Sequence, residues 1–250
     1  MYNARHEQIL QALIEGKERS VTFLAELTGV SEVTIRKDLT NLEHTGCLLR
    51  TRGGATLAEN FRMIRSMRIR QQQQRFVKQA IARSAAALIE PDEVVYIDAG
   101  STCQLAAQFL INHDIRVITN SIDVLSVLSG SETVSLSILG GNLRRSTGAM
   151  IGPAAEQILK RYQFTTAFIG ATAFSREGRF SSDNILESEL KHMALSQARR
   201  SVVITDSSKY LQQAFSVFAQ SDDVDLMITD RGFPDTDHFL DLGITLQIVS

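Results

Sequence analysis

The stretch VSEVTIRKDLTNLEHTGCLLRTRGGA, residues 30–55, contains the residues that decide the fold of the first part of this chain. Ser31 is a residue type that often begins a helix, because its hydroxyl accepts a hydrogen bond from a backbone N–H of the first turn. Ile35, Leu39 and Leu42 then repeat at helical spacing, so we expect a helix with one buried stripe. The polar side chains that fall on its other faces are Thr34, Arg36, Lys37, Thr40 and Asn41.

Two further helices are expected before it. An apolar stripe runs between Ile9 and Ile14, and Ser20 stands in the N-cap position of VTFLAELTG, residues 21–29. Gly29 suits the left-handed conformation that ends a helix. The side chains that we expect to face inward from this segment are Leu24, Ala25 and Leu27. Two short helices joined by a tight turn form a helix-turn-helix, in which the second helix enters the major groove of DNA.

The second helix and the residues after it carry groups that suit DNA. An arginine can read the edge of a guanine, and a lysine or a helix N-terminus favours phosphate. CLLRTRGGATL, residues 47–57, contains two short β-prone runs and predicts a hairpin wing that reaches the DNA backbone or the minor groove. Spacing alone also fits any small α+β domain with a solvated basic surface. The candidate DNA-binding residues are Ser31, Thr34, Arg36, Lys37, Thr40, Arg50, Arg52 and Gly53.

The same stretch closely resembles the DNA-binding signature of the DeoR family of bacterial transcriptional regulators. The resemblance rests on a serine-capped helix with Thr-Ile-Arg, a basic residue and Asp-Leu, then a Leu-Glu pair, a glycine and an Arg-x-x-Gly-Gly-Ala wing. Arg52 departs from the family, which usually has a histidine before Gly-Gly, so the contacts of the wing can differ in detail. The resemblance implies binding to double-stranded operator DNA.

The composition is that of an ordinary soluble globular protein, with 44% hydrophobic and 22% charged residues. The two cysteines, Cys47 and Cys103, show no pairing pattern and fit a reducing cytoplasm. The five histidines are scattered without metal-ligand spacing, so we expect no metal and no cofactor. No apolar run reaches the length of a membrane span, and the first residues lack the apolar core of a signal peptide.

The net charge of −2 hides an asymmetry along the chain. Residues 1–78 contain 13 Lys and Arg against 8 Asp and Glu, and residues 79–250 contain 13 against 20. The positive excess lies in residues 58–78, which fits either a polyanion partner or a solvated helix between domains. We therefore predict a winged helix-turn-helix domain at 1–57, a basic linker at 58–75, and an effector-binding and oligomerisation domain at 76–250.

From residue 94 β-prone runs alternate with helical patterns, which predicts a mainly parallel, Rossmann-like α/β sheet with helices on both faces. The expected strands are 94–98, 116–120, 135–140, 165–171, 201–206, 226–230 and 245–250. The expected helices are 76–89, 102–111, 121–129, 153–161, 185–199 and 208–213. Such sheets bind ligands outside the carboxyl ends of their strands, which is where the polar residues of this domain fall.

These strand ends carry groups that suit a phosphorylated ligand. A Gly-Ser-Thr turn at 100–102 opens a helix and offers an anion backbone N–H groups, two hydroxyls and a positive helix end. Arg144 and Lys209 add cations, while Asp98 and Asn120 suit sugar hydroxyls. Each alone fits an ordinary turn or cap, and their convergence on one edge predicts a site. The candidates are Asp98, Gly100, Ser101, Thr102, Asn120, Ser121, Gly140, Gly141, Arg144, Gly170, Glu187, Lys191 and Lys209.

The order Asp-x-Gly-Ser-Thr, Thr-Asn, Gly-Gly and a late Asp-Ser-Ser-Lys also resembles the DeoR effector domain, so the resemblance covers nearly the whole chain. It implies a domain akin to pentose-phosphate isomerases that senses a phosphorylated sugar, with Glu187 and Lys191 near the effector. That pair also fits an ordinary solvated i, i+4 pair. The resemblance further implies a cytoplasmic homo-oligomer, dimer or tetramer, that represses a carbohydrate-utilisation operon and is released from its operator by the sugar phosphate.

Two alternatives belong to other classes. The chain could be a sugar-phosphate isomerase with an accessory DNA-binding domain. The acid-rich Asp-Gly-Ala-Asp-Glu run of those enzymes is absent, so we expect no catalytic residues. RNA binding through the net basic residues 1–78 would call for a set of aromatic stacking residues, and this part of the chain contains few aromatic residues.

Overall fold

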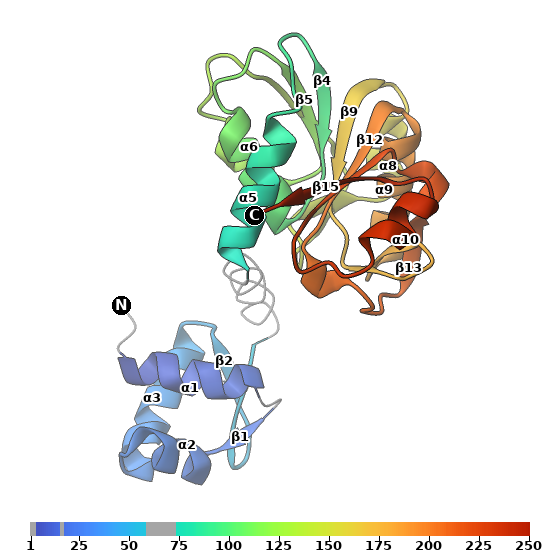
Figure 1. Ribbon diagram of the computed structural model, residues 1–250. Coiled ribbons are helices and arrows are strands. Elements are labelled where there is room, and N and C mark those ends of the chain that lie inside the picture. Colours follow the sequence, from blue (N-terminus) through green and yellow to red (C-terminus); the bar gives the residue numbers. More distant parts are fainter. Residues whose placement is uncertain (1–3, 16–17, 59–73) are drawn as a thin grey trace. The chain divides into compact units, whose positions relative to one another are not determined.

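The chain divides into two compact units, residues 1–69 and residues 70–250 (Figure 1). A computed structural model describes residues 4–15, 18–58 and 74–250. The predicted basic linker, residues 58–75, lies almost entirely outside the described residues. In the part of the chain that is described, no helix is both long enough and apolar enough to cross a membrane.

The described part of the first unit packs helices on a small sheet. Its elements are α1 (Ala4–Glu15), β1 (Arg19–Ser20), α2 (Val21–Thr28), α3 (Glu32–His44), β2 (Leu48–Arg50) and β3 (Gly54–Leu57). β2 and β3 form the antiparallel hairpin that the sequence predicts as a wing, and β1 pairs with the other edge of β3. A Cβ on Gly54 would lie 1.9 Å from the carbonyl oxygen of Arg19, so a glycine is needed where β1 approaches the wing.

The predicted ends of the two helices of the helix-turn-helix are confirmed. The hydroxyl of Ser20 accepts a hydrogen bond from the backbone N–H of Phe23 at 3.1 Å, which begins α2. The hydroxyl of Ser31 accepts one from the backbone N–H of Thr34 at 3.3 Å, which begins α3. Gly29 has φ 70° and ψ 25°, the left-handed conformation in which a side chain would be strained.

The buried face of α2 differs from the prediction at one residue. Val21 and Leu24 are buried, but the inward position expected for Leu27 is wrong, because 49% of this residue is exposed. Each step of three residues turns the side chain by about 60° around a helix, which carries Leu27 away from the core that Val21 and Leu24 face. The predicted stripe of α3 is confirmed. The buried core of this unit also includes Ile9, Leu10, Ala12, Leu13, Ile35, Leu39, Leu42, Cys47, Leu48, Ala55 and Leu57.

Asp38 ties α1 to α3. Its buried carboxylate accepts hydrogen bonds from the guanidinium of Arg5 at 2.6 and 3.1 Å and lies 3.1 Å from Nε2 of His6. Burial raises the pKa of Asp38, but the hydrogen bonds and charges of Arg5 and His6 outweigh it and hold this pKa below its ordinary value. Asp38, the aspartate that follows Thr-Ile-Arg-Lys in the sequence, therefore stabilises the fold of this unit.

The second unit is organised around a seven-stranded parallel sheet, which confirms the predicted α/β class. Its strands lie in the order β15-β14-β12-β9-β4-β5-β6, and every neighbouring pair is parallel. They are β4 (Val94–Ile97), β5 (Arg116–Thr119), β6 (Ser135–Ile138), β9 (Phe164–Ile169), β12 (Ala198–Ile204), β14 (Leu226–Asp230) and β15 (Thr245–Val249). The chain moves outward from β4 in one direction and from β9 in the other, so the strand order reverses between these two.

Helices cover both faces of this sheet, as predicted (Figure 1). The helices of the first face are α5 (Arg75–Ala86), α6 (Ser101–Leu110) and α7 (Ile122–Leu128). Those of the second face are α8 (Pro153–Leu159), α9 (Ile185–Ser196) and α10 (Thr236–Asp241). Because successive side chains of a strand point to opposite faces, Val95 and Ile97 of β4 belong to the first core and Tyr96 to the second.

Short antiparallel strands that the sequence did not predict accompany the large sheet. β7 (Asn142–Arg144) and β8 (Ala149–Ile151) form a hairpin. β10 (Ala173–Phe174), β11 (Phe180–Ser182) and β13 (Ser216–Ala219) form a small sheet. Strands of two to four residues are too short for an alternating apolar pattern to stand out.

The helix predicted at 208–213 is wrong. A single 3-10 turn, Ser207–Lys209, is present there. The next residue, Tyr210, is extended, because its hydroxyl donates a hydrogen bond to Asp235 and its ring packs edge-on against Phe233. Contacts with a segment more than twenty residues further on therefore override the local helical pattern.

Candidate functional site

The carboxyl ends of β4, β9 and β12 border a cavity of about 110 Å³. It lies where the strand order reverses between β4 and β9, the position at which open parallel sheets bind ligands. Its volume is many times the roughly 10–15 Å³ that one water needs. The residues that line it are Lys78, Ala99, Gly100, Ser101, Thr102, Cys103, Thr147, Gly170, Ala171, Thr172, Glu187, Lys191, Ile204, Thr205, Asp206 and Lys209.

The Gly-Ser-Thr turn opens α6 at the wall of this cavity. Gly100 is the N-cap, and its carbonyl oxygen accepts a hydrogen bond from the backbone N–H of Gln104 at 2.9 Å. The first N–H groups of a helix have no partner within it, and its N-terminus carries a partial positive charge. Ser101 and Thr102 add two hydroxyls to the lining. A Cβ on Gly100 would meet no heavy atom within 4 Å, so the space in front of the turn is open.

A buried ion pair joins α9 to the end of β4. The ammonium of Lys191 donates hydrogen bonds to the carboxylate of Asp98 and to the carbonyl oxygen of Gly170, the latter at 2.7 Å. The backbone N–H of Gly170 donates to the same carboxylate at 3.2 Å. Burial lowers the pKa of Lys191, but the charges of Asp98 and Glu187 outweigh it, so this pKa is raised. Lys191 is therefore a fixed cation of the lining, and Asp98 is committed to it.

Glu187 is also fully engaged. Its carboxylate accepts hydrogen bonds from Arg144 at 2.9 Å, from the hydroxyl of Thr147, and from the hydroxyl of Ser182 at 3.5 Å. The residue is 6% exposed, as is Lys191, so the solvated pair that the sequence allowed is not what forms. Glu187 instead fastens the β7–β8 hairpin to α9 at the edge of the cavity.

Two more lysines and an unpartnered hydroxyl complete the lining. Lys78 of α5 is 4% exposed, and its ammonium lies 4.0 Å from the carboxylate of Asp206. Asp206 also accepts a hydrogen bond from the backbone N–H of Ser208 at 3.2 Å, which positions the turn that ends in Lys209. The hydroxyl of Thr205 is buried and has no hydrogen-bond partner among the described residues. The lining thus combines three lysines with two carboxylates, a positive excess in an otherwise acidic unit.

Most of the predicted effector-binding residues meet at this cavity. Those that line it are Gly100, Ser101, Thr102, Gly170, Glu187, Lys191 and Lys209. Asp98 and Arg144 contact residues of the lining. Asp98 accepts a hydrogen bond from Lys191, and Arg144 donates one to Glu187. The remaining four candidates, which are also outside the lining, are Asn120, Ser121, Gly140 and Gly141.

Local structure accounts for two of these four. The hydroxyl of Ser121 accepts a hydrogen bond from the backbone N–H of Val124 at 3.2 Å and begins α7. Gly141 has φ 124°, and a Cβ there would lie 2.6 Å from the carbonyl oxygen of Ile151. The glycine therefore admits the partner strand of the β7–β8 hairpin. Asn120 is 2% exposed, and its side-chain oxygen has no partner among the described residues.

The sequence interpretation missed several lining residues, of which Lys78 is the most informative. Lys78 stands three and seven residues before Ile81 and Ala85, so it falls on the buried stripe of α5. A charged residue on an apolar helical face is seldom left without a partner, which is a signal that the sequence alone contains. The other polar lining residues that were missed are Thr147, Thr172, Thr205 and Asp206.

The first unit has an open groove of its own between α3 and β2. It is lined by Val33, Arg36, Lys37, Thr40, Asn41 and Arg50, four of which are predicted DNA-binding residues. Arg50 donates a hydrogen bond from its guanidinium to the hydroxyl of Thr40 at 3.2 Å, and its backbone N–H donates to Glu43 at 3.0 Å. These two hydrogen bonds fasten the wing strand to α3.

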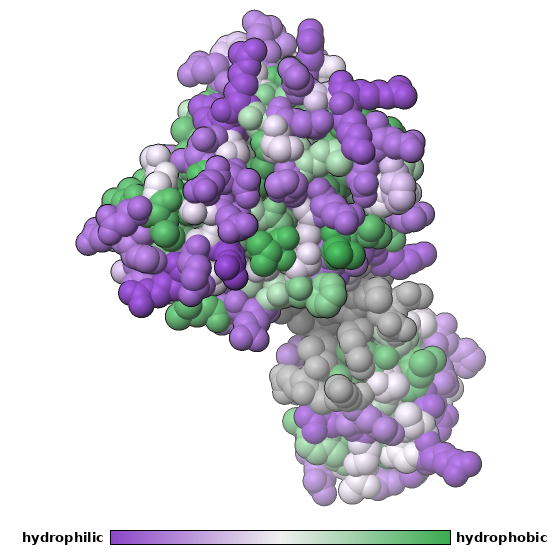
Figure 2. All heavy atoms as spheres, turned by 90° about the vertical axis from the view of Figure 1, so that its right-hand side faces the viewer, coloured by the Kyte–Doolittle hydropathy of each residue, from purple (hydrophilic) through white to green (hydrophobic). Residues whose placement is uncertain are grey.

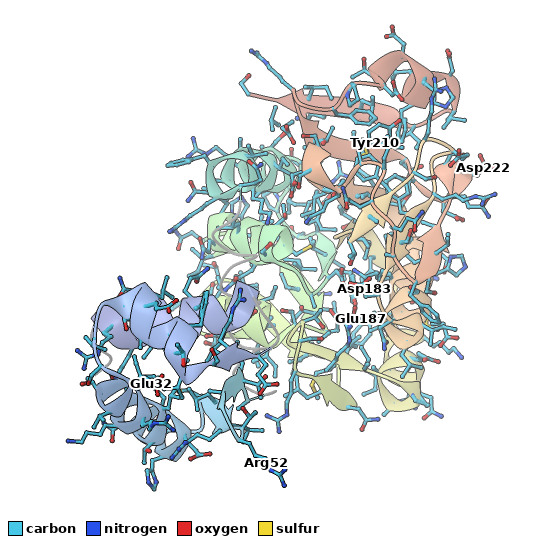
Figure 3. The ribbon with its side chains drawn as sticks, turned by 90° about the horizontal axis from the view of Figure 1, so that it is seen from below. Glu32, Arg52, Asp183, Glu187, Tyr210 and Asp222 are labelled. Carbon is cyan, nitrogen blue, oxygen red and sulfur yellow. The ribbon has the colours of Figure 1, made fainter. Side chains whose placement is uncertain are left out.

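The other predicted DNA-binding residues lie at the two ends of this surface. The hydroxyls of Ser31 and Thr34 are 3.0 Å apart at the start of α3, where Ser31 acts as the cap. Arg52 and Gly53 are exposed at the tip of the wing, and Arg52 points away from the body of the unit (Figure 3). The described residues of the first unit therefore offer a helix N-terminus, a basic groove and a wing arginine on separate elements.

Comparison with known proteins finds a matching family domain for each of the two units. Residues 5–61 match the DeoR-like helix-turn-helix domain, and residues 73–231 match the DeoR C terminal sensor domain. A ribose 5-phosphate isomerase A from Methanocaldococcus jannaschii aligns with a TM-score of 0.42 and 19% identity, over 55% of this chain and 55% of that chain. A likeness this distant supports no conclusion about the chain.

Curated relatives align over nearly the full length of the chain. The lactose phosphotransferase system repressor of Lactococcus lactis is 34% identical over 232 residues, which are 91% of this chain and 90% of the relative. The HTH-type transcriptional repressor GlcR of Bacillus subtilis is 33% identical over 223 residues, which are 89% of this chain and 86% of the relative. With both domains matched in order and the helix-turn-helix in place, the chain belongs to the DeoR family of transcriptional regulators.

Proposed function

We propose that this protein is a cytoplasmic repressor of a carbohydrate-utilisation operon, released from operator DNA when a phosphorylated sugar binds the cavity of its second unit. The names of the relatives support the regulatory part, since one is called a transcriptional repressor and the other a lactose phosphotransferase system repressor. Double-stranded DNA is bound by the groove of α3 and by the wing. Self-association as a dimer or tetramer, which would pair two such units, is part of the proposal.

The observation that carries the effector proposal is the chemistry of the cavity wall. A sugar phosphate has a dianionic end and several hydroxyls. The N-terminus of α6, with the hydroxyls of Ser101 and Thr102, suits the phosphate, and Lys209 adds a cation on a neighbouring turn. The unpartnered hydroxyl of Thr205 and the carboxylate of Asp206 suit the sugar hydroxyls.

Asp98 and Asn120 have a smaller part than their residue types suggest. Asp98 holds Lys191, so we assign it the role of positioning that cation rather than of contacting the sugar. Asn120 does not belong to the lining. The proposal therefore moves hydroxyl recognition from the ends of β4 and β5 to the end of β12.

The cavity binds without turnover in this proposal. Interconversion of an aldose and a ketose needs a carboxylate that removes a proton from carbon. Asp98 is paired with Lys191, and Glu187 accepts hydrogen bonds from Arg144 and Thr147. Both carboxylates are therefore already held by neighbouring cations and hydroxyls, and neither is free to take a proton from the sugar.

The direct test is a thermal-shift screen of the full chain against sugars and their phosphates, with each binder then followed by NMR for conversion. A ligand that binds only the folded state raises the melting temperature as its concentration exceeds its Kd. We expect at least one phosphorylated sugar to stabilise the protein, its unphosphorylated form to do so far less, and neither to be converted. Clear conversion would favour the isomerase alternative, and equal stabilisation by the free sugar would overturn the phosphate assignment.

A further inference from the structure

One face of α3 points into the groove of the first unit. Val33, Arg36 and Lys37 lie on it at positions i, i+3 and i+4, and Thr40 and Asn41 continue the stripe one turn further on. The opposite stripe of the same helix is buried in the core. The exposed stripe is therefore the surface that α3 presents to whatever enters the groove.

Among the described residues that line this groove, Val33 is the one apolar side chain. It belongs to the first turn of α3 and is 64% exposed. Valine is a weak helix former, so neither burial nor helix propensity explains it at this position. Its two methyl groups face the same space as the cation of Arg36, at the end of the helix that enters a DNA groove.

The neighbouring arginine is held in a defined orientation. The guanidinium of Arg36 donates a hydrogen bond to the carboxylate of Glu32 at 2.9 Å, and the same carboxylate accepts one from the hydroxyl of Thr22 on α2 at 2.7 Å. The hydrogen bond from Thr22 and that from Arg36 lower the pKa of Glu32, so this carboxylate stays charged. The position of the cation relative to Val33 is thereby fixed from a second helix.

We propose that Val33 reads the 5-methyl group of a thymine in the operator, within about two base pairs of the base that Arg36 contacts. The inference rests on the proposed DNA binding. Thymine is the base that presents a methyl group in the major groove, and an apolar side chain recognises it there. Side chains at i and i+3 are about 5–6 Å apart, which is less than two base-pair steps of about 3.4 Å.

The test uses duplex DNA that the parent full-length protein enriches from a random library. Each thymine of the enriched sequence is replaced in turn by deoxyuridine, which removes the methyl group and nothing else. Kd is then measured for the parent and for Val33→Ala. At one thymine we expect the replacement to weaken the parent about three- to fivefold, the effect of removing a methyl contact. Val33→Ala should bind the unmodified DNA more weakly by a similar factor and should no longer distinguish thymine from uracil at that position.

The control is Leu27→Ala, which shortens an exposed apolar side chain of α2 outside the groove and should keep the full thymine preference. Alanine favours a helix more than valine does, and melting of both variants checks that the fold is intact. A parent that enriches no sequence would overturn the proposed DNA binding and this inference with it. The inference alone would be overturned by a parent that enriches a sequence but binds thymine and uracil equally well at every position. It would also be overturned if uracil weakened the parent and Val33→Ala by the same factor at every position.

Discussion

Lys191 and Asp98 are 93 residues apart in the chain, and the ammonium of one donates a hydrogen bond to the carboxylate of the other inside the second unit. Both side chains are almost fully buried. Burial raises the pKa of Asp98, while the charge of Lys191 acts against this increase. The pair joins α9 to the end of β4 beside the point at which the strand order reverses, so it fixes the shape of the cavity as well as its charge.

Removing one member of this pair should cost more than removing both. Lys191→Met leaves the carboxylate of Asp98 buried without its cation, which typically costs about 3–5 kcal/mol. The double variant Lys191→Met/Asp98→Asn removes both charges of the pair and should recover a large part of this loss. Urea unfolding of the full chain, followed by a probe in the second unit, measures both. A double variant that is no more stable than Lys191→Met alone would mean that the two residues do not depend on each other.

The hydroxyl of Thr102 should matter for the effector and not for DNA. Thr102→Val keeps the shape of the side chain and removes the donor from the first turn of α6, so effector affinity should fall by about 1–3 kcal/mol. Calorimetric titration with a sugar phosphate found by the thermal-shift screen measures this. Thr133→Val, at an exposed threonine before β6, is the matched control and should bind like the parent. Equal affinities in all three proteins would show that the Gly-Ser-Thr turn is only a turn.

Arg36 and Arg52 should affect DNA binding in different ways. Arg36→Ala should cost about 1–3 kcal/mol on the selected DNA and less on random DNA, because a base contact is lost. Arg52→Ala, at the exposed tip of the wing, should weaken both DNAs and reduce the slope of log K against log salt by about 1. Fluorescence anisotropy over a range of salt concentrations separates the two. An unchanged salt slope for Arg52→Ala would remove the wing from the DNA contacts.

Asp38 should make the first unit sensitive to acid. Its pKa in the folded protein lies below the ordinary value of 3.8, so its contribution to stability is complete above that value and is lost as the pH falls through the folded pKa. Asp38→Asn should lower the stability of the first unit by about 1–3 kcal/mol at neutral pH. Hydrogen exchange in peptides of α1 and α3, measured on the full chain, reports this. The difference from the parent should vanish in strong acid, and a difference that does not depend on pH would contradict the proposed role of its charge.

Local chemistry predicted the parts of the fold that depend on neighbours in the sequence. The caps at Ser20 and Ser31, the end of α2 at Gly29 and the stripe of α3 are each set within one or two helical turns, and all are confirmed. The residues that line the cavity were partly predictable for another reason. The carboxyl ends of parallel strands share one edge, so polar residues that follow β4, β9 and β12 are brought together whatever their separation in the chain.

Features that depend on distant partners could not be predicted in this way. The helix expected at 185–199 ends at Ser196, because Arg200 lies in β12 and donates hydrogen bonds to Thr166 of β9 and to the carbonyl oxygen of Leu88. Arg200 can occupy a half-buried position in the sheet because the neighbouring strand supplies an acceptor for its guanidinium. Gly141 was predicted to lie at the ligand. In the structure a side chain there would clash with the carbonyl oxygen of Ile151, a contact that cannot be read from the sequence.

Figure 2 shows one face of the molecule as a mixture of polar and apolar residues, so surface colour alone does not identify a binding site there. The central claim concerns the cavity of the second unit and its effect on DNA binding. Its most direct test is to titrate a phosphorylated sugar into a preformed complex of the full chain with its selected DNA and to follow release by anisotropy. We predict that at least one sugar phosphate dissociates the complex, that the same sugar without its phosphate does not, and that Thr102→Val needs a higher concentration. A complex that survives every sugar phosphate, or that the free sugar dissociates equally well, would contradict the account.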